Sequence, residues 1–260
     1  MGYIDSHAHL CCEQLYRDID NIIASFSQNQ IARVLLICCD SKEYERARQL
    51  INKYDCFDVA FGIHPESANE YEEDDLLKLE AELSAGLIKV VGEIGLDYYW
   101  VKDNKTRQQE LFIRQLALAD KYDLAIAVHS RDASEDTYNI LKSHHRSKKG
   151  ILHCYSGSVE MMERYVKLGY HISLAGPVTF ANARTTVEVA KALPLNRLLY
   201  ETDCPYLTPV PFRGKRNDPN LVIYTAAKIA ELKNIAIEEL NAQVSDNYRR
   251  LLEKKDGQIS

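Results

Sequence analysis

The chain opens on Tyr3-Ile4-Asp5-Ser6-His7-Ala8-His9-Leu10, an apolar start that runs into two histidines. The apolar opening is typical of a β-strand, and residues two apart on a strand point to the same face. His7 and His9 can therefore bind one cation together, with the backbone pleat alone setting their geometry. No GxGxxG motif follows this strand, which argues against a dinucleotide-binding, doubly wound sheet.

The rest of the chain alternates apolar, β-branched runs with segments of helical periodicity. The predicted strands are Tyr3–Ile4, Arg33–Cys39, Phe57–Gly62, Ile88–Glu93, Leu124–His129, Gly150–His153, Tyr170–Leu174 and Arg197–Glu201. Thr185-x-x-Glu188 has the form of a capping box that opens a helix. Eight βα units without a linker or repeat predict an α/β protein: one (β/α)8 TIM barrel, typically ~250 residues long, over residues 1–260.

Composition narrows the class of protein. Of 260 residues, 46% are hydrophobic and 27% charged, which is typical of a globular domain. No apolar stretch approaches the roughly 18 residues of a membrane span. The N-terminus lacks a basic region followed by a long apolar segment, so no signal peptide is expected. Seven cysteines without CxxC or disulfide-framework spacing predict reduced thiols in a cytoplasmic protein. The net charge of −6 argues against a protein that coats nucleic acid, but it leaves room for a local phosphate contact.

Chemically reactive side chains fall at the C-terminal ends of the predicted strands, where barrel active sites gather. These residues are His7, His9, His64, Glu93, His129, His153 and Asp203. Any one of them alone would be a common turn or loop residue. Their joint placement at one end of one barrel predicts a site. His171 lies near the start of its strand and should face the opposite end, and His144 and His145 fall in a polar helix end.

Imidazole and carboxylate ligands together suit Zn²⁺ or Mn²⁺ and accept Mg²⁺. Four histidines and two carboxylates are more than one tetrahedral site needs, and they match two divalent cations that share a bridging carboxylate. Two cations about 3.5–4 Å apart activate a water and clamp an in-line displacement at phosphorus. The pattern therefore predicts metal-assisted hydrolysis and leaves the substrate open.

Six motifs together resemble the TatD family of metal-dependent deoxyribonucleases, within the amidohydrolase-like barrel superfamily. They are Asp5-Ser6-His7-Ala8-His9, Gly62-Ile63-His64-Pro65, Gly92-Glu93-Ile94-Gly95-Leu96-Asp97-Tyr98, His129-Ser130-Arg131, His153-Cys154-Tyr155-Ser156-Gly157 and Glu201-Thr202-Asp203-Cys204-Pro205-Tyr206-Leu207. The similarity extends from residue 3 to about residue 250. Glu-x-Gly-Leu-Asp with Glu-Thr-Asp-x-Pro is specific to the family, whereas His-x-His is shared across the superfamily.

The resemblance implies a role for each residue. One metal would take His7, His9 and Asp203, and the other would take His129 and His153, with Glu93 bridging. Asp203 would also orient the attacking water or act as its base. His64 would face the scissile phosphate, and Glu201 would be a supporting or water-orienting carboxylate. The implied activity is 3′-to-5′ trimming of DNA at single-stranded or frayed ends, and of RNA in some members.

Candidate substrate contacts lie near these motifs. The segment 209–219 resembles a loop after strand eight in one subgroup of the family, and Arg213, Lys215 and Arg216 there are predicted to contact phosphate. Arg131 is either a second phosphate contact or part of a structural ion pair. The run Tyr98-Tyr99-Trp100 either stacks on bases or packs the mouth of the barrel.

The chain departs from the family pattern at Phe212, where many members have histidine, and at Cys204, where many have a small residue. Loss of that histidine leaves substrate preference open. Cys204 adjoins a predicted ligand, and its side chain should point away from the metals.

Two other functions fit parts of the pattern. Binuclear relatives hydrolyse small amides, lactones or phosphoesters, often with a carboxylated lysine on strand four. Here Glu93 occupies that place and Lys89 lies four residues earlier, which favours the nuclease. A non-catalytic scaffold would be free to lose ligands, yet every expected ligand type is present. The sequence does not give the metal, the strand preference, the end polarity or the pathway, and for the oligomeric state a monomer is expected.

Overall fold

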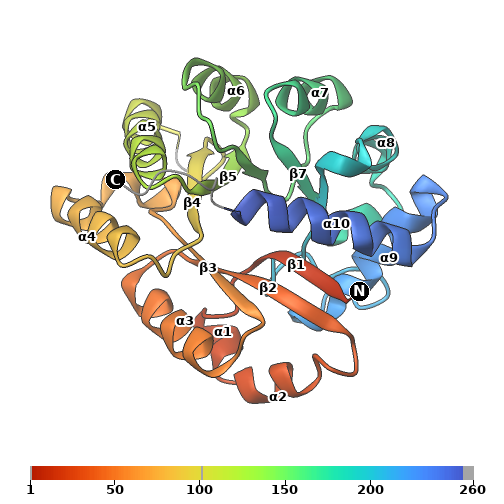
Figure 1. Cartoon of the computed structure of the whole chain (residues 1–260). Helices are drawn as coiled ribbons and strands as arrows, with labels where there is room; N and C mark the ends of the chain where they lie inside the picture. The colour runs from red at the N-terminus through yellow and green to blue at the C-terminus, as the bar shows by residue number, and fades with distance from the viewer. Residues whose placement is uncertain (1, 101, 254–260) are drawn as a thin grey trace.

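The computed structural model describes residues 2–100 and 102–253 and contains one eight-stranded parallel sheet in chain order (Figure 1). The strands are β1 (Tyr3–Ala8), β2 (Ile31–Cys38), β3 (Phe57–Phe61), β4 (Val90–Asp97), β5 (Ala125–Arg131), β6 (Gly150–Leu152), β7 (His171–Leu174) and β8 (Leu198–Tyr200). The predicted (β/α)8 barrel is confirmed. Strands such as β2, fully buried from Val34 to Cys38, are covered on both faces, as parallel strands require.

Helices surround the strands, and α10 crosses in front of them in Figure 1. The helices are α1 (Glu13–Tyr16), α2 (Ile19–Ala24), α3 (Ser41–Lys53), α4 (Glu73–Ser84), α5 (Lys105–Lys121), α6 (Ser134–Ser143), α7 (Val159–Lys167), α8 (Arg184–Ala192), α9 (Val222–Lys233) and α10 (Ile237–Leu252). Local sequence sets several starts: Asp40 caps α3 by accepting the Glu43 N–H at 2.8 Å, and Ser158 caps α7. The predicted capping box at Thr185 does not form, because the N-cap of α8 is Ala183, two residues earlier.

The ring of strands is joined between β1 and the segment that follows β8. The Asp203 N–H donates to the His7 carbonyl at 3.0 Å, and the His9 N–H donates to the Cys204 carbonyl at 3.0 Å. Beneath this seam, the buried Asp5 carboxylate accepts the Thr202 N–H at 2.9 Å and the Thr202 hydroxyl at 2.5 Å. Burial raises the pKa of Asp5 to about 8. These bonds hold His7, His9 and Asp203 at fixed positions relative to one another.

One strand boundary differs from the prediction in a way that matters for the site. β4 continues to Asp97, so Glu93 lies inside the strand and does not end it. Gly95 packs against β5, where a Cβ would lie 2.0 Å from the His129 carbonyl oxygen. The β4–β5 register shifts between Val91 and Ile94, and such a bulge re-aims a side chain, here that of Glu93.

Candidate metal centre

All seven predicted site residues lie at the C-terminal end of the barrel, and their side chains come from six strands or the loops after them. They are His7 in β1, His9 just after it, His64 after β3, Glu93 in β4, His129 in β5, His153 after β6 and Asp203 after β8. The parallel topology carries every strand to the same end, so residues almost 200 positions apart meet. The roles assigned to them remain predictions.

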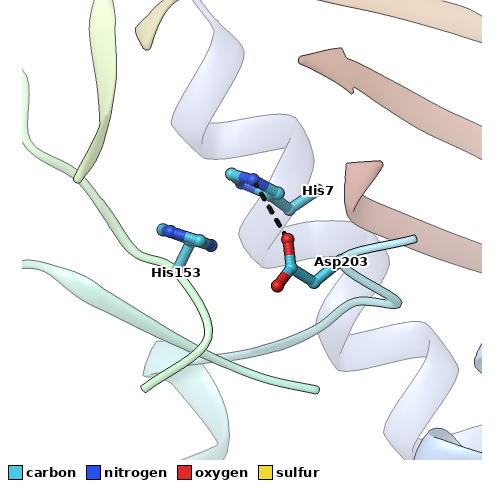
Figure 2. Close-up of side chains that lie close together, drawn as sticks. All are labelled: His7, His153 and Asp203. Atoms are coloured by element: carbon cyan, nitrogen blue, oxygen red, sulfur yellow. Dashed lines mark ion pairs between the residues drawn. The ribbon is translucent and has the colours of Figure 1, made fainter. Parts of the chain in front are cut away.

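One oxygen of Glu93 faces the histidines of the first strand. Its Oε2 lies 3.3 Å from His7 Nε2 and 3.4 Å from His9 Nε2. Asp203 Oδ1 approaches the same two nitrogens, at 3.7 Å and 3.5 Å. Figure 2 shows Asp203 beneath His7, with His153 beside them, and the His7 and His153 rings stack with centroids 3.9 Å apart. This half of the cluster is formed by His7, His9, Asp203 and Glu93 Oε2.

The other oxygen of Glu93 faces a second set of histidines. Its Oε1 lies 2.6 Å from His153 Nε2, 2.7 Å from His129 Nδ1 and 3.4 Å from His64 Nε2. Glu93 is only 3% exposed, so solvent contributes little to stabilising the charge of its carboxylate. Each carboxylate oxygen therefore faces a different group of nitrogens.

The spacing of the nitrogens also fits metal ligands. His7 Nε2 and His9 Nε2 lie 3.3 Å apart, and His129 Nδ1 and His153 Nε2 lie 3.2 Å apart. Two nitrogens bound to one tetrahedral Zn²⁺ at about 2.0–2.1 Å are separated by about 3.4 Å. Nitrogen and carboxylate oxygen atoms within 4.8 Å of one another form groups on both halves of the cluster. The residues present therefore fit divalent cations.

Charge is shared unevenly within the cluster. Burial alone would raise the pKa of Glu93, but the imidazoles of His153, His64 and His129 hold it well below its ordinary value. Burial likewise opposes the charged form of His153, yet the Glu93 carboxylate raises its pKa well above the usual range. Buried carboxylates thus require positive charge beside them, as protons on imidazole or as a cation that displaces those protons.

Two carboxylates outside the cluster orient its histidines. Asp97 Oδ2 lies 2.9 Å from His129 Nε2, and Asp97 Oδ1 accepts the N–H groups of Tyr99 and Trp100, both at 2.9 Å. Asp97 was assigned no role from the sequence, because the predicted strand ended at Glu93. In the structure the strand continues to Asp97, and residues four apart on a strand lie on the same face. Glu201 Oε1 accepts the Cys154 N–H at 2.6 Å and lies 3.5 Å from His153 Nδ1, which suits the predicted supporting role.

A cysteine also borders the cluster. Cys39 Sγ lies 4.0 Å from His9 Nδ1, and both atoms group with the Glu43 carboxylate. From the sequence, Cys39 was only the last residue of a predicted strand. Cys204, by contrast, is fully buried and joins none of the described groups of metal-type residues. All seven cysteines are free thiols.

The predicted substrate contacts have different surroundings. Exposed Arg131 stacks on the Tyr99 ring at 4.1 Å and lies 5.3 Å from the Trp100 ring, and in the described part of the chain it has no carboxylate partner. Tyr99 and Trp100 are 44% and 61% exposed, whereas Tyr98 is buried and donates to Asp136 at 2.8 Å. Tyr98 therefore packs the barrel mouth, and its two neighbours remain open to a ligand.

The loop after β8 holds the other three cations. Arg213 lies over the Phe180 ring at 4.3 Å, and Lys215 Nζ lies 5.6 Å from the Phe212 ring. Both are exposed. Arg216 pairs with Asp18 at 2.7 Å and donates to the Gln14 carbonyl at 3.1 Å. Arg216 is thus already bound by other residues of the protein. Of the two arginines in this loop, Arg213 has the freer guanidinium.

Parallel βα units that carry buried histidines and carboxylates at the C-terminal ends of their strands define the class as a metal-dependent hydrolase. The family model described as TatD related DNase matches residues 4–253. The chain belongs to this family, and the resemblance drawn from the motifs is confirmed.

The names of similar proteins agree with the class of metal-dependent hydrolases. The chain is 43% identical to the Bacillus subtilis protein YabD over 249 residues, covering 95% of this chain and 97% of YabD. It is 38% identical to Escherichia coli K12 YcfH, covering 96% of each. Both are known as uncharacterized metal-dependent hydrolases. The crystal structure of the TatD homolog YjjV from E. coli K12 superposes with a TM-score of 0.92 at 30% identity, covering 96% of this chain and 97% of YjjV.

Among the helices of the described residues, none combines the length and the apolar character that crossing a membrane requires.

Proposed function

We propose that this hydrolase is a 3′-to-5′ exodeoxyribonuclease that uses two divalent cations, Mg²⁺, Mn²⁺ or Zn²⁺, on single-stranded or frayed DNA ends. It acts in the cytoplasm as a monomer, with RNA as a second substrate to be tested. One observation carries the proposal. The two oxygens of Glu93 face two separate sets of nitrogens, as two cations sharing one carboxylate require.

Each residue of the cluster has a task in that reaction. When bound, the cations lower the pKa of water and neutralise charge that develops on the phosphate. His7, His9 and Asp203 would hold one cation, and His129 and His153 the other. The Asp203 side chain is 13% exposed, so it borders the solvent that supplies the water, and its carboxylate would accept the water's proton.

His64 would contact the phosphate. Its Nδ1 accepts the Glu66 N–H at 3.3 Å, so in the neutral ring Nε2 carries the proton. Its side chain is 16% exposed and its Nε2 lies 3.4 Å from Glu93 Oε1. His64 Nε2–H would therefore donate to a non-bridging phosphate oxygen that sits above the cluster.

Groups outside the cluster would position the strand. The Tyr99 and Trp100 rings with the Arg131 guanidinium offer stacking surfaces and a cation for one nucleotide. Arg213 and Lys215 would contact the phosphates on the other side of the mouth, and Arg216 would do so only by leaving Asp18. Local contacts of this kind suit a protein with an overall net charge of −6.

The test is digestion of a single-stranded oligonucleotide labelled separately at each end, in DNA and RNA versions. The protein is stripped of metal and resupplied with Mg²⁺, Mn²⁺ or Zn²⁺. Glu93→Ala is run beside Glu163→Ala, a matched control at an exposed position of α7. We expect metal-dependent shortening from the 3′ end, lost only in Glu93→Ala. No cleavage with any metal, in protein shown to bind two, would move the assignment to hydrolysis of small amides, lactones or phosphoesters.

A further inference from the structure

A second polar site lies at the N-terminal ends of the strands, opposite the metal centre. A cavity of about 260 Å³ is bordered by the segments that enter β5 to β8 and by α10. Its walls include Lys149 before β6, His171 at the start of β7, Arg197 before β8, and Asn247 and Arg250 in α10. None of the metal-centre residues borders it. The cavity is therefore a separate site on the same barrel.

His171 is the buried group of this cavity. It is 7% exposed, and its Nδ1 is buried without a hydrogen-bond partner. Burial and the nearby Arg197 lower the pKa of His171 to about 4, so the ring is neutral at neutral pH and one nitrogen donates while the other accepts. Buried polar atoms in proteins are nearly always hydrogen-bonded. His171 also borders the cavity, so a ligand bound there would lie beside this ring.

Two cations on the same wall lack a counter-charge. Arg197 donates to the Gly169 carbonyl at 3.1 Å, and Lys149 Nζ lies 5.8 Å from the Tyr170 ring, but within the described ranges neither pairs with a carboxylate. Burial lowers the pKa of Lys149, which marks its charge as under-compensated. By contrast, Arg250 beside them pairs with Asp246 at 2.8 Å.

The charge of the wall sets the charge of the ligand. The cationic residues are Lys148, Lys149, Arg197 and Arg250, and the carboxylates are Asp123 and Glu253. Because Asp246 pairs with Arg250, one positive charge is left in excess with His171 neutral. A phosphate monoester carries about −1.5 to −2 at pH 7, and guanidinium groups bind its oxygens in pairs. A volume of about 260 Å³ leaves room for a phosphate and a further group.

We propose that this cavity binds a small phosphate-bearing anion through Arg197, Lys149 and His171. The ligand is inorganic phosphate or the phosphate of a larger monoester such as a nucleotide. The site is independent of the metal-dependent reaction proposed above, because its residues belong to the other end of the barrel.

The experiment is isothermal titration calorimetry on full-length protein stripped of metal and held in chelator. The probes are inorganic phosphate, adenosine 5′-monophosphate and, as a monoanionic control, acetate. We expect the phosphate probes to bind with a Kd below about 1 mM and acetate to give no signal. Arg197→Met should weaken phosphate binding about tenfold or more, because it removes a charged hydrogen-bond donor. Arg48→Met, the same change at an exposed position of α3, should leave binding as in the wild type.

The outcomes separate the ligand source and the location. Equal affinity for both phosphate probes assigns the site to the phosphate group alone, and tighter binding of the nucleotide adds a subsite for the nucleoside. Lys149→Met, at a half-exposed position, repeats the test if Arg197→Met fails to fold by circular dichroism. The proposal is overturned if neither phosphate probe binds below about 10 mM, or if Arg197→Met and Lys149→Met both bind phosphate as the wild type does.

Discussion

The two ends of the barrel each bury a histidine, and the two histidines have opposite properties. His153, at the C-terminal end, lies 2.6 Å from the Glu93 carboxylate, which raises its pKa well above the ordinary value. His171, at the N-terminal end, is buried and lies near the charge of Arg197, and both effects lower its pKa to about 4. Both rings lose most of their solvent. The difference therefore comes from the neighbouring charges, and it divides the barrel into a cation-binding end and a cationic end.

The topology explains the division. Loops that leave the strands carry His9, His64, His153 and Asp203, whereas loops that enter them carry Lys149 and Arg197. Between the ends lies a neutral polar contact, in which Ser6 Oγ and Ser173 Oγ are 2.9 Å apart and buried. A barrel interior filled with side chains keeps the two ends apart.

The largest expected effect is the loss of metal binding at the C-terminal end of the barrel in Glu93→Gln. The amide keeps the shape of the side chain but removes the charge that both nitrogen sets face. We expect loss of metal from the centre and a fall in kcat/KM of about a thousandfold or more, measured on labelled oligonucleotides beside metal analysis. Glu163→Gln is the control. A variant that kept two metals and full activity would contradict the division.

The second effect concerns the pH dependence of stability at the cationic end. The pKa of folded His171 is about 4, and that of an unfolded histidine is about 6.5. Between these two pH values the unfolded chain therefore binds a proton that the folded chain does not bind. His171 therefore costs stability as the pH falls from about 6.5 to about 4, by about 2 kcal/mol at about pH 5.

Urea unfolding of wild type and His171→Leu, in phosphate-free buffer near pH 7.5 and pH 5, measures this cost. The variant lacks the titrating ring, so its stability relative to wild type should rise by about 2 kcal/mol between the two pH values. An unchanged difference would show that the folded ring takes up its proton normally, and the contrast with His153 would fail.

The third effect tests how the cation-binding end is supported. Asp97→Asn retains a side chain beside His129 Nε2 but removes the negative charge that orients and polarises the ring. Loss of such a partner typically lowers metal affinity or activity by about 10–100-fold. Metal titration and kcat/KM measure it, with the exposed Asp103→Asn as control. Wild-type metal affinity in Asp97→Asn would mean that the cluster positions His129 unaided.

The smallest effect lies between the two ends. Ser173→Ala removes one buried hydrogen bond while the Ser6 hydroxyl still donates to the Tyr200 carbonyl at 3.0 Å. We expect a loss of about 1 kcal/mol in the free energy of unfolding, with kcat/KM and metal content close to wild type. A tenfold loss of activity would instead reveal that the ends are coupled through the core.

Sequence patterns predicted much of this molecule because they report periodicity. Apolar, β-branched runs separated by helical segments predicted the eight strands, within a few residues at most boundaries. The prediction was wrong for the end of β4. Glycine is uncommon within strands, and here pairing with β5 extends the strand to Asp97. The donor set of the metal centre was also predictable, because the C-terminal ends of all strands of a barrel meet.

The sequence by itself determined the fold class, the family and the set of side chains that meet at one end of the barrel. Only the tertiary structure decided which oxygen of Glu93 faces which histidines, that Asp97 orients His129, and that Arg216 is tied to Asp18. It also decided that His171 stands beside a cationic cavity. The reason is physical: periodicity along a chain fixes the face and the end at which a residue lies, whereas pairing and charge depend on distances of a few ångströms between segments far apart in sequence.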